Sequence, residues 1–459
     1  MKNLLKTSVF LLLTLFIVSC SDDDDNNGGG EMTQTIADFV AGNDDYSSLL
    51  AALERAGLTA TLDGTTNFTV FAPDNTAFQT FLDDNGFASL DAVPTDLLTN
   101  VLLNHVVNGS VTSTQLSTGY ISSLATSAEG ANLSMYINTT SGVEINGAST
   151  VVAADIEVDN GVIHAVDSVI GLPTITTLAA ANSDFSTLVA ALGAASLVGT
   201  VSAPDANLTV LAPGNAAFSD FLNANGFTGL DDIPADVLSQ TLLNHVLGAK
   251  VLSTDLSTSY SNTLATYGAT ANNISLYINT ESGVRFNGVS SVAVADVVAT
   301  NGIIHAVDAV IALPTVVTFA TADATFGTLV QALTRADQPD FVSILSTPNG
   351  TSPAPFTVFA PTNDAFGALL TELGATSLDD IDGATLTATL NYHVIAEANV
   401  RAEDLTNGPV TTLGGDVTID AGNATITDAN GRVSNIIVTN VQAANGVVHA
   451  IDTVILPEL

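Results

Sequence analysis

The sequence predicts an α+β protein of three consecutive domains, and three observations carry this prediction. One phrase, Phe68–Phe78 in its first copy, returns from Leu208 and again from Phe356. Each copy has the pattern of a buried strand, a proline that stops the strand, and an amphipathic helix. The interval of roughly 140 residues has the size of a domain, far above the roughly 20–50 residues of a solenoid repeat.

The first copy shows how each phrase is expected to fold. The residues from Phe68 to Phe71 favour a strand, and Pro73 ends it because proline has no N–H to donate. Asp74 or Asn75 is expected to cap the following helix. A second helix is expected around Leu98–His105, with the histidine on its apolar stripe.

The second half of the first domain changes to short β runs. We expect strands at 132–137, 142–146, 151–158 and 162–170. The Asn160-Gly161 pair between the last two predicts a two-residue hairpin with a type I′ turn, which needs positive φ at both positions. The final run is apolar on both faces, so it is expected in the middle of the sheet.

Two further phrases repeat in step with the first. One is Leu102-Leu-Asn-His-Val106 and the other is Asn160-Gly-Val-Ile-His-Ala-Val-Asp167, each with two later copies. The three ordered blocks resemble the fasciclin domain family, whose members carry T-x-F-A-P-x-N-x-A-F, a Tyr-His or Asn-His pair, and a closing N-G-x-[IV]-H-x-[IV]-D. The match covers nearly everything after residue 32.

The resemblance implies a β-sandwich or wedge with a helical cluster in each domain. We expect domain 1 at 32–173, domain 2 at 174–314 and domain 3 at 315–459. Residues 337–355 of domain 3 contain four prolines and are expected to be a loop insertion and a candidate contact surface. The short proline-bearing linkers favour a semi-rigid chain of domains.

The N-terminal residues predict export and anchoring. Residues 1–19 have the pattern of a signal peptide, and Ile17-Val-Ser-Cys20 is similar to a bacterial lipobox that would acylate Cys20. Residues 20–31 form an acidic and glycine-rich tether, similar to the export tag of Bacteroidetes-type surface lipoproteins. The alternatives are an ordinary signal peptide with an incidental cysteine, and a charge run that only solvates the tether. We expect outer-membrane lipid as one partner, through Cys20, with the domains exposed at the cell surface.

The composition of the chain limits the kinds of molecule that it is expected to bind. The chain has 47 Asp and Glu against 8 Lys and Arg, for a formal net charge of −39. This charge opposes binding to nucleic acid and anionic lipid, which both need neutralising cations. It is compatible with weakly held surface cations, but no ligand spacing defines a calcium site.

The polar residues of the repeated phrases are expected to be structural. The six histidines come two per domain. A metal site needs three or four convergent ligands, and two well-separated histidines without cysteine do not supply them. We therefore expect no metal, no cofactor and no catalytic residue, and no enzyme motif is present. The structural set is Asn75, Asn215, Asn363, His105, His245, Tyr392, His393, His164, His305, His449, Asp167, Asp308 and Asp452.

One dipeptide has a binding precedent through the resemblance. Animal fasciclin modules carry an Asp-Ile pair, just ahead of the closing block, that contributes to adhesion. Asp155-Ile156 stands there in domain 1 and Asp296-Val297 in domain 2, whereas domain 3 has Asn440-Val441. The alternative is that these residues only pack within a strand.

The predicted function is adhesion or interaction at the cell surface, through contact with other cells, matrix or polysaccharide, including biofilm. Its partner is an unidentified surface protein or polysaccharide. One alternative is an accessory protein for nutrient or glycan capture, which would need aromatic side chains in a chain with no Trp and 7 Tyr. The other alternative is a passive spacer.

Overall fold

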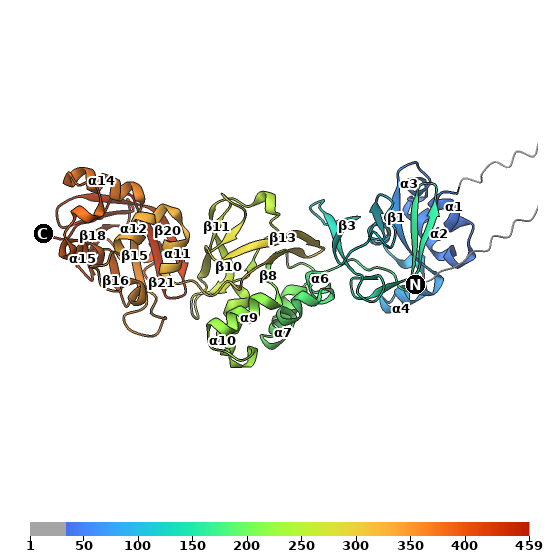
Figure 1. Ribbon diagram of the computed structural model, residues 1–459, viewed down its shortest axis with the longest axis horizontal. Helices are drawn as coiled ribbons and strands as arrows, with labels where there is room; N and C mark the ends of the chain where they lie inside the picture. The colour runs from blue at the N-terminus through green and yellow to red at the C-terminus, as the bar shows by residue number, and fades with distance from the viewer. Residues whose placement is uncertain (1–33, 459) are drawn as a thin grey trace, which may run out of the picture.

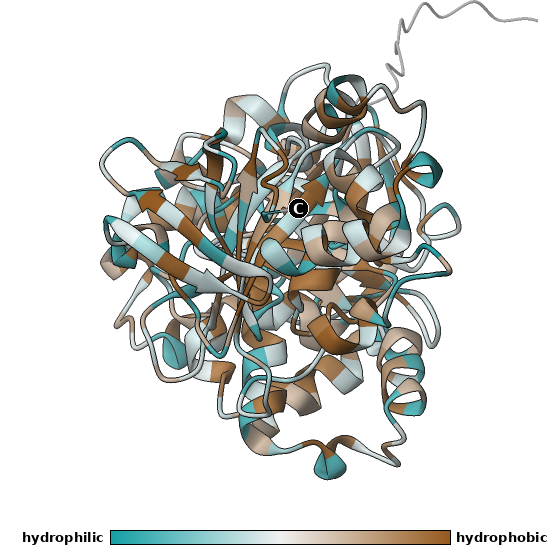
Figure 2. Cartoon of the chain, turned by 90° about the vertical axis from the view of Figure 1, so that its left-hand side faces the viewer, coloured by the Kyte–Doolittle hydropathy of each residue, from teal (hydrophilic) through white to brown (hydrophobic). Residues whose placement is uncertain are grey.

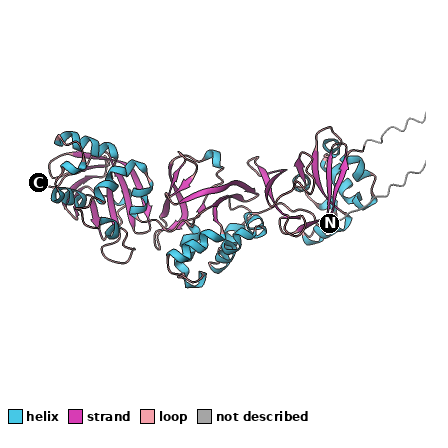
Figure 3. Ribbon diagram, in the orientation of Figure 1, coloured by secondary structure: helices cyan, strands magenta, loops and turns pink. Residues whose placement is uncertain are grey.

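The computed structural model describes residues 34–458 and shows three domains in a row, so the described part of the chain is elongated (Figure 1). In each domain the helices lie against the strands in a separate layer (Figure 3). The predicted α+β class with three tandem domains is therefore confirmed. The predicted leader and tether, including Cys20, lie outside the described residues.

The three domains repeat the same order of elements. Domain 1 contains α1 (Ile36–Ala41), α2 (Ser47–Ala56), α3 (Thr59–Leu62), β1 (Phe68–Pro73), α4 (Asn75–Asp84), α5 (Thr95–Leu103), β2 (Val106–Asn108), β3 (Gly119–Thr126), β4 (Asn132–Asn138), β5 (Glu144–Ile145), β6 (Ser149–Val158) and β7 (Gly161–Val166). Domain 2 contains α6 (Ile175–Ala181), α7 (Ser186–Ala194), α8 (Val198–Ser202), β8 (Leu208–Pro213), α9 (Asn215–Ala224), α10 (Ala235–Leu243), β9 (Val246–Leu247), β10 (Ser259–Thr266), β11 (Asn273–Asn279), β12 (Arg285–Phe286), β13 (Ser290–Ala299) and β14 (Gly302–Val307). Domain 3 contains α11 (Val316–Ala322), α12 (Gly327–Leu333), α13 (Phe341–Leu345), β15 (Phe356–Pro361), α14 (Asn363–Leu373), α15 (Gly383–Tyr392), β16 (Val394–Ala396), β17 (Gly408–Thr412), β18 (Gly415–Asp420), β19 (Thr425–Thr427), β20 (Val433–Ala443) and β21 (Gly446–Ile451).

Each domain has one curled sheet of seven strands. The order in domain 1 is β2-β1-β7-β6-β5-β4-β3, domain 3 repeats it, and in domain 2 the same strands close into a barrel. The first and last long strands of each domain run parallel, as β1 with β7 does from Phe68↔Gly161 to Pro73↔Val166. Every residue of β7 is buried, as expected for a central strand.

The closing hairpin differs from the prediction by one position. Val158 pairs with Gly161, so the turn residues are Asp159 and Asn160, and neither has positive φ. The predicted type I′ turn at Asn160-Gly161 is therefore wrong. Gly161 is needed for another reason, since a Cβ there would lie 1.9 Å from the carbonyl oxygen of Phe68 on the neighbouring strand.

The asparagine of this hairpin connects the sheet to the helices. Asn160 Oδ1 accepts a hydrogen bond from Ile36 N at 2.8 Å, and Nδ2 donates to the carbonyls of Leu62 and Gly64 at 2.7 and 2.8 Å. One buried side chain thus holds the start of α1 and the end of α3. The equivalent residues, with the same three bonds at 2.8–3.0 Å, are Asn301 and Asn445.

Three smaller expectations are corrected by the structure. The last strand ends at Val166 because Asp167 begins the exit turn, and the run at 142–146 forms only the short strand β5. The expected cap of α4 is confirmed and is Asp74, which accepts from Ala77 N at 2.8 Å. The proline-rich segment 337–355 is no plain loop, because it contains α13 with Phe341 and Leu345 buried.

Two apolar cores lie on the two sides of β1 and its equivalents. One fills the space between sheet and helices, and the other fills the inside of the curled sheet, where Phe71, Met135 and Ile145 are fully buried. Seen along the molecule from domain 3, hydrophobic segments gather centrally and hydrophilic loops lie at the periphery (Figure 2).

The close approach of the hairpin glycine gives a test of this arrangement. We expect Gly302→Ala to cost domain 2 about 3 kcal/mol, because its Cβ would lie 2.3 Å from the carbonyl oxygen of Leu208. In the same domain Gly193→Ala, on α7 with open space around the new Cβ, should be neutral or stabilising. Denaturant unfolding of both variants measures the difference, and equal stabilities would contradict this packing.

Candidate interaction surface

One histidine per domain ends the helix before the second strand. His105 is buried, its Nδ1 lies 2.8 Å from the carbonyl oxygen of Val101, and its Nε2 accepts from Ile170 N at 2.8 Å. These partners assign the neutral ring with the proton on Nδ1. His245 and His393 make the equivalent bonds, to Thr241 O and Ile311 N and to Thr389 O and Ile455 N.

Burial has an electrostatic consequence for these three rings. Desolvation lowers the pKa of His105, His245 and His393 from 6.5 to about 4. The rings therefore remain neutral in the fold at pH values where an unfolded chain would protonate them.

The second histidine of each domain sits on the last strand and uses the opposite tautomer. His164 Nε2 donates to Val111 O at 2.9 Å, and its Nδ1 accepts from Asp155 N at 3.2 Å. His305 and His449 make the same pair of contacts, with Val251 O and Asp296 N and with Val400 O and Asn440 N. Both nitrogens of all six rings thus bind backbone groups, so a metal could be ligated only by breaking one of these bonds.

The Asp of the candidate adhesion dipeptide lies at a bulge in its strand, where the pairing register shifts. Asp155, Asp296 and Asn440 have φ of 59°, 59° and 60°, a conformation that Asp and Asn tolerate better than other residues. Asp155 accepts from Ser113 N and Oγ at 2.7 and 2.6 Å, which fixes the loop before β3. Asn440 accepts from Ala402 N at 2.7 Å, which explains why domain 3 can depart from the Asp pattern.

The second residue of this dipeptide is not exposed for binding in every domain. Ile156 is half-buried, whereas Val297 is only 2% exposed and packs in the core of domain 2. A binding partner at this strand therefore has to contact the neighbouring residues.

The remaining motif residues hold local structure. The closing Asp carboxylates cap the start of the preceding strand, by accepting from Thr150 N, Ser291 N and Asn435 N at 2.6–2.8 Å, and they are Asp167, Asp308 and Asp452. The first residue of α4, α9 or α14 is an asparagine whose side chain binds backbone groups at and just before the start of α2, α7 or α12. These asparagines are Asn75, Asn215 and Asn363.

Tyr392 marks a rearrangement in domain 3. In domain 1 the equivalent Asn104 donates to the carbonyls of Ile170 and Gly171. In domain 3 Asn430 donates to the carbonyls of Leu456 and Pro457, one residue further along the segment that follows the last strand. Tyr392 instead fills the inner core and donates to Asp416 O at 2.5 Å. The Tyr-His variant of the motif is thus matched by an asparagine on a different loop.

Beside each bulge the same strand exposes three small or apolar residues, which we call the bulge strip. Val152, Val294 and Ile437 are 64%, 45% and 52% exposed, unusual values for such side chains on a strand. The adjoining strand pairs only with the first residues of β6, at Ser149 and Thr150, and so leaves the strip uncovered. The bulge strips are 152–154, 293–295 and 437–439.

The domains meet in two joints with the same design, which the sequence had not indicated. In the first, Tyr120 Oη of domain 1 donates to Leu178 O at 3.2 Å, and Val298 N donates to Ser134 Oγ at 2.9 Å. Burial raises the pKa of Tyr120 to about 12. Lys250 also bridges the joint to Glu129, with both Nζ–Oε distances at 3.1 Å.

The second joint repeats the tyrosine and serine contacts, but its tyrosine donates to a carboxylate instead of a backbone carbonyl. Tyr260 Oη donates to Asp323 Oδ2 at 2.9 Å, and Gln442 N donates to Ser275 Oγ at 2.9 Å. The sequence carried a signal for these joints, because a tyrosine pair recurs on β3 and β4 of domain 1 and on β10 and β11 of domain 2. In domain 3, Pro409 and Thr418 face each other at this place.

A polar cleft of about 350 Å³ lies at the second joint. Its walls include Tyr260, Asn262 and Asn273 from domain 2 and Arg401 and Thr439 from domain 3. Thr439 belongs to the bulge strip, so the strip of domain 3 forms one wall of the cleft.

Two searches bear on other kinds of site. Among residues 34–458, no three His, Cys, Asp or Glu side chains converge as a set of metal ligands. Over the same residues no single helix is long and apolar enough to cross a membrane, although Val316–Ala322 and Ala324–Leu333, bent by 94°, meet the length and composition criteria as a pair.

The depressed histidine pKa values predict how stability depends on pH. As pH falls from 6.5 towards 4, the unfolded chain binds protons that the folded rings do not, so each domain should lose stability, by up to about 3 kcal/mol. His245→Asn should flatten this dependence in domain 2. Denaturant unfolding at several pH values measures it, and an unchanged slope in the variant would contradict the assignment.

The bulge predicts a graded response at Asp296. We expect Asp296→Asn to leave the stability of domain 2 within about 0.5 kcal/mol, because Asn440 already fills this role in domain 3. Asp296→Ala should cost about 2 kcal/mol through the left-handed φ and the lost bonds to Ser253. Thermal unfolding compares the two, and equal losses would argue against a bulge requirement.

Comparison with known proteins gives the family. The fasciclin domain family matches residues 44–173, 183–314 and 324–457. Protein sll1483 of Synechocystis is 37% identical over 30% of this chain and 74% of its own length, and cell surface glycolipoprotein MPB83 of Mycobacterium bovis is 34% identical over 31% and 60%.

Longer relatives align with nearly the whole chain. Transforming growth factor-beta-induced protein ig-h3 of Sus scrofa is 29% identical over 93% of this chain, and human periostin is 27% identical over 92%. The chain spans 58% and 47% of the length of these two relatives. A solved FAS1 domain pair from the insect cell adhesion molecule fasciclin I matches 57% of this chain and 96% of its own, with a TM-score of 0.39 and 16% identity. Because the family matches most of the sequence in three successive copies, the chain belongs to the fasciclin domain family.

Proposed function

We propose that this chain is a surface adhesion protein, in which each fasciclin domain contributes one weak contact through its bulge strip. The observation that carries the proposal is the exposure of an apolar strip at the same place in all three domains, beside an otherwise well-satisfied bulge. Exposed apolar strand residues are a liability unless they are used for contact.

The proposal includes attachment to the outer membrane through acylated Cys20. The lipobox pattern supports it, as does the description of the relative MPB83 as a cell surface glycolipoprotein. Anchoring places all three strips on one tether, so weak contacts add through effective concentration. The contact partner is a surface protein or a polysaccharide of another cell or of the matrix, and no catalytic step is involved.

Polysaccharide binding is a second candidate, favoured by the polar cleft at the second joint. Amide side chains, an arginine and a tyrosine line it, and such groups provide planar hydrogen bonding together with an aromatic face. This function would make the chain an accessory binding protein instead of an adhesin. Loss of binding to a polysaccharide array in Asn262→Ala, with cell attachment unchanged, would favour it.

Removing the strips tests adhesion directly. Cells that display the chain with Val152→Ser, Val294→Ser and Ile437→Ser should attach to each other and to matrix at least tenfold less than wild type, because all three contacts lose apolar area. Each single variant should lower attachment only about two- to threefold. Counts of attached cells, at equal surface amounts of the chain, give the measurement.

A matched control uses exposed apolar residues away from the strips. Val237→Ser, Leu373→Ser and Leu413→Ser change side chains that are 37%, 51% and 50% exposed, so they remove comparable apolar surface. This variant should attach like wild type. If it loses as much attachment as the strip variant, or if the strip variant attaches normally, the strips are not the contact sites.

A further inference from the structure

Domain 2 contains an apolar cavity between its helices and its sheet. The cavity has a volume of about 200 Å³. The side chains that decide its size come from α6, α7 and α8, and they are Ala179, Val189, Val198 and Val201. Thr176 is the one polar residue among its lining residues, so the cavity offers no set of hydrogen-bond partners that would order water.

Domain 1 has larger side chains at two of these positions, whereas domain 3 has the same pair, Ala320 and Val330. Counted from the helix caps Thr35 and Thr174, domain 1 has Val40 where domain 2 has Ala179. By the same alignment Leu50 of domain 1 stands where Val189 lies. Relative to domain 1, the cavity of domain 2 is therefore lined by smaller residues at defined positions.

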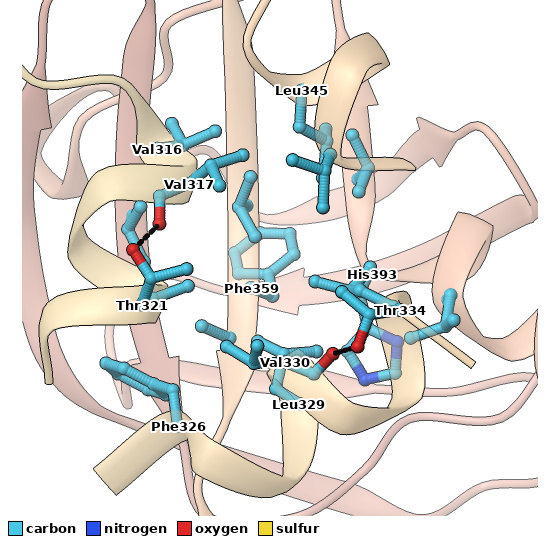
Figure 4. Close-up of a pocket in the computed structure, with 18 residues that line it drawn as sticks. Val316, Val317, Thr321, Phe326, Leu329, Val330, Thr334, Leu345, Phe359 and His393 are labelled. Atoms are coloured by element: carbon cyan, nitrogen blue, oxygen red, sulfur yellow. Dashed lines mark hydrogen bonds between the residues drawn. The ribbon is translucent and has the colours of Figure 1, made fainter. Parts of the chain in front are cut away.

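Domain 3 lies between these two cases. Leu345 occupies the place of Val201, since their carbonyls accept from the equivalent hairpin residues Asn445 and Asn301. The space that remains there is about 40 Å³ (Figure 4). In Figure 4 Val317, Leu329 and Leu345 come from three different helices and converge around this space.

The surroundings of the domain 2 cavity carry almost no charge. Between residues 174 and 204 Asp184 is the one ionisable side chain, in a protein of formal net charge −39. At the rim Val198 is 44% exposed and Ala180 is also exposed. No cation lies in this segment to receive a carboxylate or phosphate, so the rim selects against anionic ligands.

We propose that this cavity is a binding site for a small uncharged hydrocarbon group, such as a single ring or the end of a neutral lipid chain. Apolar cavities of about 150 Å³ stay dry and accept benzene, so the volume of domain 2 is sufficient. The site is separate from the bulge strips, and it does not depend on the adhesion function.

Titration calorimetry of the purified full chain with benzene tests this site. We expect saturable binding at one site per chain. The double variant Ala179→Val with Val189→Leu, which copies the side chains of domain 1, should weaken benzene affinity at least tenfold. Val201→Leu, which copies domain 3, is a second filling variant in case the first is unstable, and it should also weaken the affinity.

Four comparisons make the test specific. Ala320→Val with Val330→Leu, the equivalent changes in domain 3, should leave the affinity within twofold of wild type. Benzoate should bind at least tenfold more weakly than benzene, because its carboxylate finds no cation at the rim. Neutral phosphatidylcholine vesicles should not sediment with the chain, whereas octanol should compete with benzene.

Two results would overturn the proposal. One is the absence of saturable benzene binding by the wild-type chain, or equal binding by both filled variants. The other is sedimentation with vesicles without any benzene binding, which would make the uncharged helical surface a membrane contact. Neither result affects the strip variants, so failure here is distinguishable from failure of the adhesion proposal.

Discussion

Each domain depends on one buried asparagine in its closing hairpin. Asn160 and its two equivalents use all of their main hydrogen-bonding capacity on backbone groups of α1 and α3, or of the corresponding helices. These helices are 4–7 residues long, too short to be stable alone. They form because the asparagine satisfies their free ends and the sheet covers their apolar face. Loss of this side chain would leave two buried backbone groups and one partly buried group without partners.

Much of the domain structure could be predicted from the sequence, because its signals are local or repeated. Strand, proline and helix follow one another within eleven residues of the first phrase, and the apolar run of β7 showed that the strand is central. The turn before β7 could not be predicted correctly. Asn-Gly usually supplies positive φ, but here Gly161 is required by the oxygen of Phe68, almost a hundred residues away in the chain.

The candidate site was less predictable for the same reason. Position in the motif suggested structural histidines, but the two opposite tautomers follow from carbonyls and amides that only the fold brings near. The bulge strip depends on where β5 stops pairing, and the joints depend on surfaces that belong to different domains. The result is a row of three domains in which the repeated histidines bind backbone groups inside each domain, while the bulge strips remain exposed.

The central strand of each sheet is also the last one made. β1 pairs in parallel with β7, so the middle of the sheet stays open until the end of the domain has been synthesised. A nascent domain therefore exposes both edges of that gap over most of its length, and long-range parallel pairing of this kind forms slowly. Each domain therefore remains open to aggregation until its last strand has been made, and its fold is completed only then.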